Sequence, residues 1–113
     1  MSQDFSISAE EFVHEFKELK DSLLEGYFTP SSELSRVNEL KSGGLTDQQI
    51  DLVKKVCDEQ LTDALYTILL GLDGCASISQ HQISYELKDE NSNRLSGNGE
   101  IEACAYEAFH GNT

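Results

Sequence analysis

The chain has 113 residues, a length that predicts a single domain over residues 1–113 with enough core to fold without disulfide or metal support. Its 21 acidic residues outnumber eight Lys and Arg, which gives a formal net charge of −13 and a pI near 4.3. This charge excludes ordinary contacts with nucleic acid and disfavours anionic membranes, because both depend on Lys and Arg. It favours a basic protein partner, with solubility alone as the alternative reason for the acidity.

The sequence also indicates where the protein resides. Its first residues contain neither the basic segment nor the apolar segment of a targeting signal. No apolar run approaches the roughly 20 residues that span a bilayer. The cysteines Cys57, Cys75 and Cys104 include no C-x-x-C pair, as is typical of free thiols in a reducing compartment. We therefore expect a cytoplasmic protein that makes no membrane contact and carries no cofactor.

The first predicted helix covers residues 9–25. Ser8 and Glu11 have the spacing of a capping box, in which each side chain accepts a bond from the other residue's backbone N–H. Apolar residues then recur at helical spacing, with charged residues between them. These apolar positions are Phe12, Val13, Phe16, Leu19, Leu23 and Leu24. Gly26 is the expected stop.

A short second helix is predicted over residues 32–41, after the break that Pro30 imposes. Leu34, Val37 and Leu40 recur there every three residues, which favours a helix.

A long central helix is predicted over residues 47–70. Thr46 and Gln49 form a second capping box at its start. The stretch 64–70 is apolar on nearly all sides, which is typical of a buried helix, so it should lie at the centre of the core.

Beyond Gly74 the hydrophobic period changes. Ile83, Tyr85 and Leu87 alternate with polar residues, as in a strand with one buried face. Residues 89–93 have turn composition, and residues 94–96 would then return as the second strand of a short β-hairpin.

The last segment fits a helix over residues 99–109, although Ile101, Ala103 and Ala105 suit a strand equally well. Its alanines favour the helix. The predicted fold class is therefore α+β and predominantly helical, with three to four helices, a short β-hairpin and one long central helix over about 47–70.

Residues 89–100 carry the sharpest local motif. Oxygen-bearing side chains fall at positions 1, 3, 5 and 12, the ligand spacing of an EF-hand calcium loop: Asp89, Asn91, Asn93 and Glu100. Arg94 stands where that loop needs Gly, and the preceding segment is predicted as a strand. A polar turn is the alternative interpretation, and we favour it.

Zinc binding and thiol catalysis have little support. Cys75 and His81 are six residues apart, as are Cys104 and His110, whereas zinc-binding pairs are closer. Cys75 follows a helix C-terminus and Asp73, and both disfavour a thiolate. We therefore do not expect an enzyme.

The acidic residues of the second half of the chain, if gathered on one face, would attract a basic surface. Candidate rim residues of such an interface are Glu86, Asp89, Glu90 and Glu100. Candidate aromatic anchors are Tyr85 and Tyr106, together with Tyr27 and Phe28.

Three segments carry a resemblance to a known class: Leu69-Leu70-Gly71-Leu72-Asp73-Gly74, residues 85–91 and residues 106–111. The C-terminal half resembles small acidic bacterial proteins of the toxin-immunity kind. The resemblance implies an inhibitor that neutralises a toxin domain, often a basic nuclease, by tight one-to-one binding in the producer's cytoplasm. It implies no catalytic residues.

The leading hypothesis is thus an acidic binding protein that blocks a basic partner, as an immunity protein does. One alternative is a homodimeric structural or regulatory subunit, because the long apolar helix exceeds what a small domain buries; monomer and homodimer both stay open. A second alternative is a small metal-dependent module that uses the calcium-like loop at 89–100.

Overall fold

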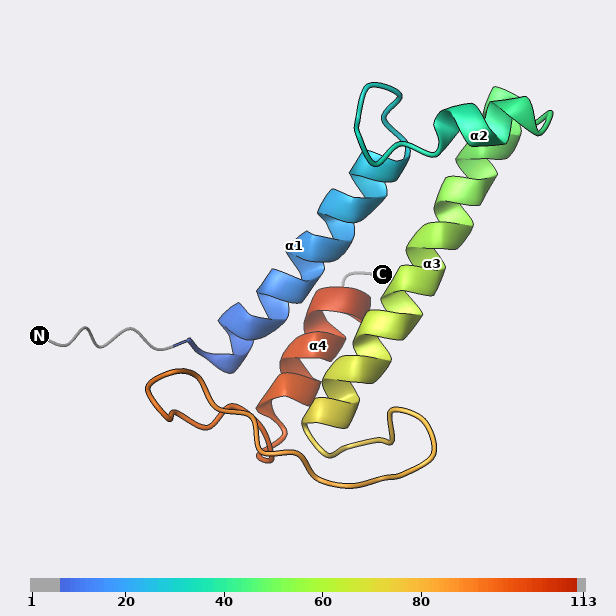
Figure 1. The fold of residues 1–113 in the computed structure, drawn as a ribbon. Coiled ribbons are helices and arrows are strands. Elements are labelled where there is room, and N and C mark those ends of the chain that lie inside the picture. The colour runs from blue at the N-terminus through green and yellow to red at the C-terminus, as the bar shows by residue number, and fades with distance from the viewer. Residues whose placement is uncertain (1–6, 112–113) are drawn as a thin grey trace, which may run out of the picture. The chain divides into compact units, whose positions relative to one another are not determined.

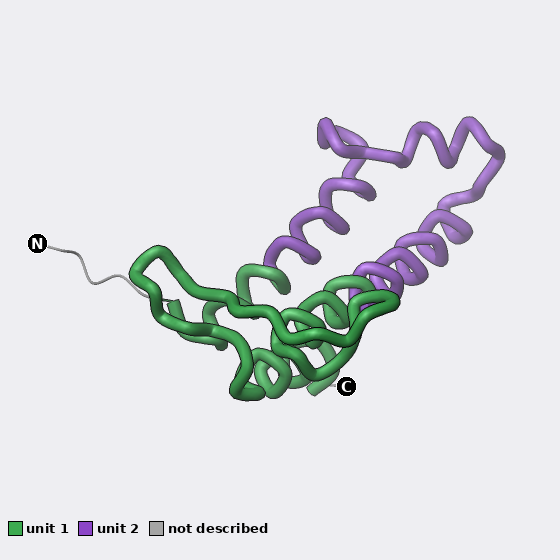
Figure 2. Tube along the Cα trace, turned by 60° about the horizontal axis from the view of Figure 1, so that its bottom comes forward, with its two compact units in different colours: residues 1–17, 64–113 green, residues 18–63 purple. Residues whose placement is uncertain are grey.

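The computed structural model describes residues 7–111, which form four helices: α1 (Ala9–Tyr27), α2 (Val37–Ser42), α3 (Asp47–Leu72) and α4 (Glu100–His110) (Figure 1). Two compact units are present (Figure 2). Unit 1 comprises residues 1–17 and 64–113, and unit 2 comprises residues 18–63. The described part of unit 1 therefore contains the start of α1, the end of α3, the following loop and α4.

Both capping boxes are confirmed. The Ser8 N–H donates to Glu11 Oε1 at 2.9 Å, and the Glu11 N–H donates to Ser8 Oγ at 3.0 Å. Thr46 and Gln49 make the same reciprocal pair, at 2.8 and 3.2 Å. Because these side chains replace the missing intrahelical partners of the first N–H groups, α1 and α3 begin where the sequence predicts.

The other helix limits differ from the predicted ones by varying amounts. The first helix continues past Gly26 to Tyr27, and the third ends at Leu72. The second begins only at Val37, because residues 29–35 form turns in which Ser35 Oγ accepts the Val37 N–H. The helical choice for the last segment is confirmed by α4.

The predicted β-hairpin is wrong, and with it the α+β class, because the described residues contain no strand and are helical apart from their loops. The only trace of pairing in this range is an isolated antiparallel bridge between Lys88 and Arg94. Ile83 and Tyr85, which should have formed the buried face of the strand, are 52% and 37% exposed. A lone hairpin is marginal in water, and of the three alternating apolar residues only Leu87 packs against the core, where Leu95 is buried.

The core of unit 1 joins α1, α3, α4 and the loop before α4. Its buried members are Ala9, Val13, Leu69, Leu95, Ile101 and Ala105. Leu69 and Ile101 are fully buried. Ala64 and Thr67 are exposed, so the end of α3 is buried on one side and not all round.

Unit 2 has a smaller core, and an ion pair made by a buried lysine supports it. Val37 and Ile50 are its buried apolar residues. Lys20, whose side chain is 8% exposed, donates to Asp58 Oδ1 at 2.7 Å and to Thr62 Oγ1 at 3.0 Å. These two acceptors compensate the cost of burying its ammonium group.

None of the helices in residues 7–111 has a stretch that is both long enough and apolar enough to cross a membrane.

Candidate functional site

The loop between α3 and α4 is fixed by a buried carboxylate. Asp73, which is 4% exposed, accepts the Gly97 N–H at 2.6 Å and the Glu102 N–H at 3.0 Å. Gly99, the residue before α4, has no side chain to cap the helix, so Asp73 supplies the cap from the end of α3. Gly97 has a φ of 91°, a value that Gly adopts without strain.

A buried hydroxyl fixes the middle of the same loop. Ser96, which is 1% exposed, donates from Oγ to the Tyr85 carbonyl at 2.7 Å and accepts the Leu87 N–H at 2.9 Å. The Leu95 N–H donates to the Leu87 carbonyl at 2.7 Å. These bonds satisfy backbone groups that a strand ladder would otherwise pair. They hold the loop in one conformation, and the loop in turn fixes the position of α4 within unit 1.

The calcium-like segment forms a turn around Asp89. Its carboxylate accepts the N–H groups of Asn91 and Asn93, the Asn93 amide and, at 3.3 Å, the Ile7 N–H. The bond from the Asn93 backbone is the main cause that holds the pKa of Asp89 below its usual value. Within residues 7–111, no group of three or more His, Cys, Asp or Glu side chains is placed to hold a metal ion. This geometry favours the polar turn over a calcium loop.

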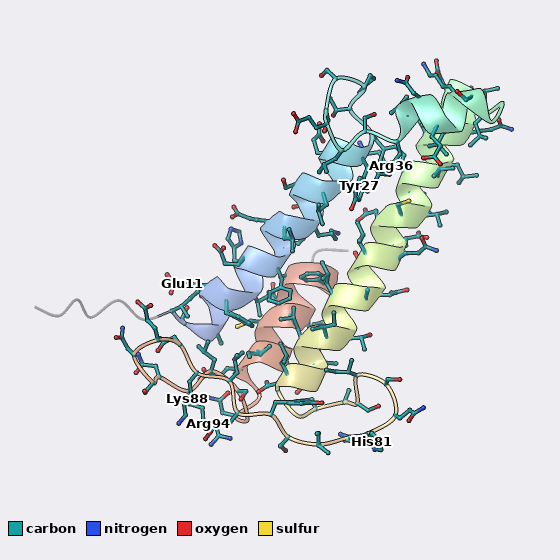
Figure 3. The ribbon with its side chains drawn as sticks, viewed as in Figure 1. Glu11, Tyr27, Arg36, His81, Lys88 and Arg94 are labelled. Atoms are coloured by element: carbon teal, nitrogen blue, oxygen red, sulfur yellow. The ribbon has the colours of Figure 1, made fainter. Side chains whose placement is uncertain are left out.

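The thiol of Cys75 is held in its neutral form. The pKa of Cys75 is raised to about 11, and desolvation is the largest cause. The hydrogen bond from Sγ to Glu102 Oε1, at 3.3 Å, is the next cause, and the charges of Glu102 and Asp73 add to it. Its predicted unreactivity thus gains a cause that the sequence did not indicate, namely Glu102 on α4. His81, the residue considered as its partner, lies on the outer part of the loop after α3 (Figure 3).

We expect Cys75 to react with iodoacetamide about tenfold more slowly than a small model thiol at mildly alkaline pH. Its raised pKa lowers the fraction of thiolate, which slows the reaction, and makes that thiolate a better nucleophile, which offsets only part of the loss. Glu102→Gln should accelerate the reaction by removing the negative charge beside the sulfur. Peptide mapping by mass spectrometry separates Cys75 from Cys57 and Cys104. Equal rates for Cys75 and the model thiol would contradict the arrangement.

The most distinctive surface of unit 1 is a groove between α1 and α4, which we call the α1–α4 groove. It has a volume of ≈ 350 Å³. Its lining residues are Glu10, Val13, His14, Ala103, Cys104, Glu107 and Ala108. A second depression of ≈ 410 Å³ adjoins it along α1, shares Glu10 and His14, and adds Ile7, Glu11 and Glu15. The α1 wall and the α4 wall therefore each contribute carboxylates, and the remaining lining residues of the α1–α4 groove, which we call its floor, are small or apolar apart from His14.

The electrostatic character of this groove is negative. None of the residues that line it or the adjoining depression is Lys or Arg. The pKa of Cys104 is raised, first by burial and then by the charges of Glu10 and Glu100. Unit 1 as a whole has 11 acidic residues against three basic ones, a formal charge of −8. Two of the three bases are engaged in the loop, Lys88 with Glu86 at 3.7 Å and Arg94 with the Ser96 carbonyl (Figure 3).

The structure separates the six residues predicted to contact a partner. Glu100 lies near the groove, since its charge acts on Cys104. Glu86 and Glu90 are exposed on the loop, and Asp89 is occupied by its turn. Tyr85 is 37% exposed, and Tyr106 is 57% exposed with its ring 5.9 Å from that of His110.

Glu10 and Glu107, which form the two walls, were not predicted as site residues. Helical spacing places each carboxylate on a solvent-facing side of its helix, but 97 positions separate the two residues in the sequence. Only the packing of α1 against α4 brings them to one groove, and no local pattern encodes that.

Unit 2 has an apolar depression of its own. Tyr27, Phe28, Leu40, Val53 and Cys57 line its ≈ 430 Å³ together with Arg36 and Glu39. The Arg36 guanidinium lies 5.5 Å from the centre of the Tyr27 ring, and this cation–π contact covers part of the aromatic surface. Figure 3 labels both residues. Tyr27 and Phe28, proposed above as anchors, are accordingly half-buried.

Comparison of the chain with protein-family models, with curated proteins and with solved structures finds no match.

Proposed function

We propose that this protein is a binding protein that holds a basic segment of another protein in its α1–α4 groove. The observation that carries the proposal is the combination of carboxylates on both walls with a floor of small and apolar side chains. Opposite charge steers the encounter and fixes the orientation, whereas burial of apolar surface at the floor supplies most of the affinity.

A binding role is better supported than catalysis by the state of the thiols. The pKa of Cys75 and the pKa of Cys104 are both raised, which lowers the fraction of the thiolate that nucleophilic catalysis by these residues requires. The resemblance to toxin-immunity proteins suggests which basic protein is bound: a toxin domain that the protein neutralises in the cytoplasm. The product of a neighbouring reading frame is the natural candidate for that partner.

The test is a titration of the protein with a cationic peptide built from Lys, Leu and Ala, followed by calorimetry at low and at physiological salt. We expect the double variant Glu10→Gln, Glu107→Gln to bind about 2- to 30-fold more weakly, because each of the two lost ion pairs is worth about 0.2–1 kcal/mol. The difference should shrink as salt rises, since exposed charges are screened.

The matched control is the double variant Glu33→Gln, Asp51→Asn, which changes the net charge equally at two exposed positions of unit 2. We expect its affinity to stay within twofold of the unmodified protein. If both double variants lose affinity to the same extent, the peptide senses only the overall charge and the groove is not its site.

A further inference from the structure

We propose that the occupant of the α1–α4 groove is a single amphipathic α-helix, with small or apolar residues on the face toward the floor and Lys or Arg along both flanks. This inference rests on the proposed function and specifies the form of its partner.

The floor of the groove suits the close approach of a helix. Three of its residues are small: Ala103 is exposed, and Cys104 and Ala108 are half-buried. Val13, which is 1% exposed, supports them from the core. The distance between two packed helices is set by the side chains at their contact, so small floor residues allow a third helix to lie near α1 and α4. Apolar residues spaced three and four apart on that helix would fill the floor.

The two walls match the two flanks of a helix. Glu10 stands on the wall formed by α1 and Glu107 on the wall formed by α4, so carboxylates face the occupant from both sides. Glu11 and Glu15 extend the negative wall along α1, and Figure 3 shows Glu11 projecting from that helix. Basic residues placed on both edges of an apolar helical stripe would meet both walls at once.

An extended occupant fits less well for a backbone reason. Extended peptides usually bind by adding to the edge of a sheet, and the described residues 7–111 contain no strand that offers such an edge. An extended segment on this floor would leave N–H and C=O groups without partners at a cost of about 1–3 kcal/mol for each buried group. A helix satisfies its own backbone groups. The 11 residues of α4 measure about 16 Å, which provides a wall for about three turns of the bound helix.

The test compares two peptides of identical Lys, Leu and Ala composition. One order places Leu and Ala on a single helical stripe with Lys on both flanks, and the other alternates apolar and Lys residues with a period of two. We expect the helical order to bind at least tenfold more tightly, and the circular dichroism of the mixture to show helix beyond the sum of its components. Equal affinity of the two orders, or tight binding without added helix, would overturn the inference.

A substitution at the floor gives a second readout that leaves charge unchanged. Ala103→Leu should weaken binding of the helical peptide about tenfold by adding bulk within the groove, whereas Ala64→Leu, at an equally exposed position of α3 that does not line the groove, should not. Unchanged binding by the Ala103→Leu protein would place the peptide elsewhere and defeat the inference.

The two proposals fail in distinguishable ways. If both peptide orders bind equally and the Glu10→Gln, Glu107→Gln protein binds them more weakly, a basic segment is held there but not as a helix, and only the present inference is lost. If the groove and control double variants are indistinguishable with both peptides, the proposed function is lost as well.

Discussion

Replacing Asp73 by Ala should lower the free energy of unfolding by about 2.5–4 kcal/mol, since the bond from the Gly97 N–H to a charged acceptor contributes about 1.5–3 kcal/mol and the bond that caps α4 about 1 kcal/mol. The side chain is 4% exposed and joins the end of α3 to Gly97 and to the first turn of α4. Urea denaturation followed by circular dichroism measures the change, and the loss should be accompanied by a lower helix signal if α4 frays.

The matched control for this variant is Asp63→Ala, which removes the same charge from an exposed position of α3. In a protein with a net charge of −13, loss of any carboxylate relieves some repulsion, and the control measures that contribution separately. We expect Asp63→Ala to change stability by less than about 0.5 kcal/mol. Similar losses from both variants would show that Asp73 is not a specific link.

Replacing Leu69 by Ala should cost about 2–5 kcal/mol, because the side chain is fully buried in the core of unit 1 and its removal leaves a cavity. Leu52→Ala makes the same substitution in the same helix at a residue that is 61% exposed. The difference between the two unfolding free energies therefore isolates burial from helix propensity. Thermal and urea denaturation of the two proteins provide the comparison.

An equally small effect at Leu69 and Leu52 would contradict the placement of Leu69 in the core. The opposite pattern, with a large loss at Leu52 alone, would indicate that an apolar contact covers the exposed side of α3. That outcome would revive the homodimer alternative, in which a second copy buries this side.

Local chemistry made the helices predictable. Each capping box combines two residues three positions apart, and the hydrophobic period of the following segment lies within a single helix. The long helix and the helical choice at the C-terminus follow from such patterns. The start of the second helix was missed, because the Ser and Thr side chains of residues 29–35 bond the backbone in turns that compete with a helix.

The hairpin failed for the opposite reason, since its outcome depends on distant residues. The alternation of Ile83, Tyr85 and Leu87 is a genuine period of two, but a strand also needs a partner and a surface on which to pack. Instead, the hydroxyl of Ser96 satisfies the Tyr85 carbonyl and the Leu87 N–H, and the carboxylate of Asp73 fixes Gly97 beyond the predicted second strand. Asp73 acts on residues 24 and 29 positions away, which no local pattern reports.

The sequence indicated that the protein carries acidic surface, but it did not indicate which carboxylates line the α1–α4 groove. The excess of carboxylates indicated an acidic surface, and Glu100 was named, yet the walls of the groove are Glu10 and Glu107. Composition reports how much charge a protein carries, whereas the packing of helices decides which charges share a face.

The remote cap on α4 has a consequence for the order of folding. A helix of 11 residues is too short to persist by itself in water, and this one starts at a glycine that contributes no capping group. We therefore expect α4 to form only after α3 has folded and placed Asp73 beside the first turn of α4. The C-terminal helix then depends on a residue far earlier in the chain. Residues 100–110 must therefore have left the ribosome before one wall of the groove exists, and no binding that requires both walls can begin sooner.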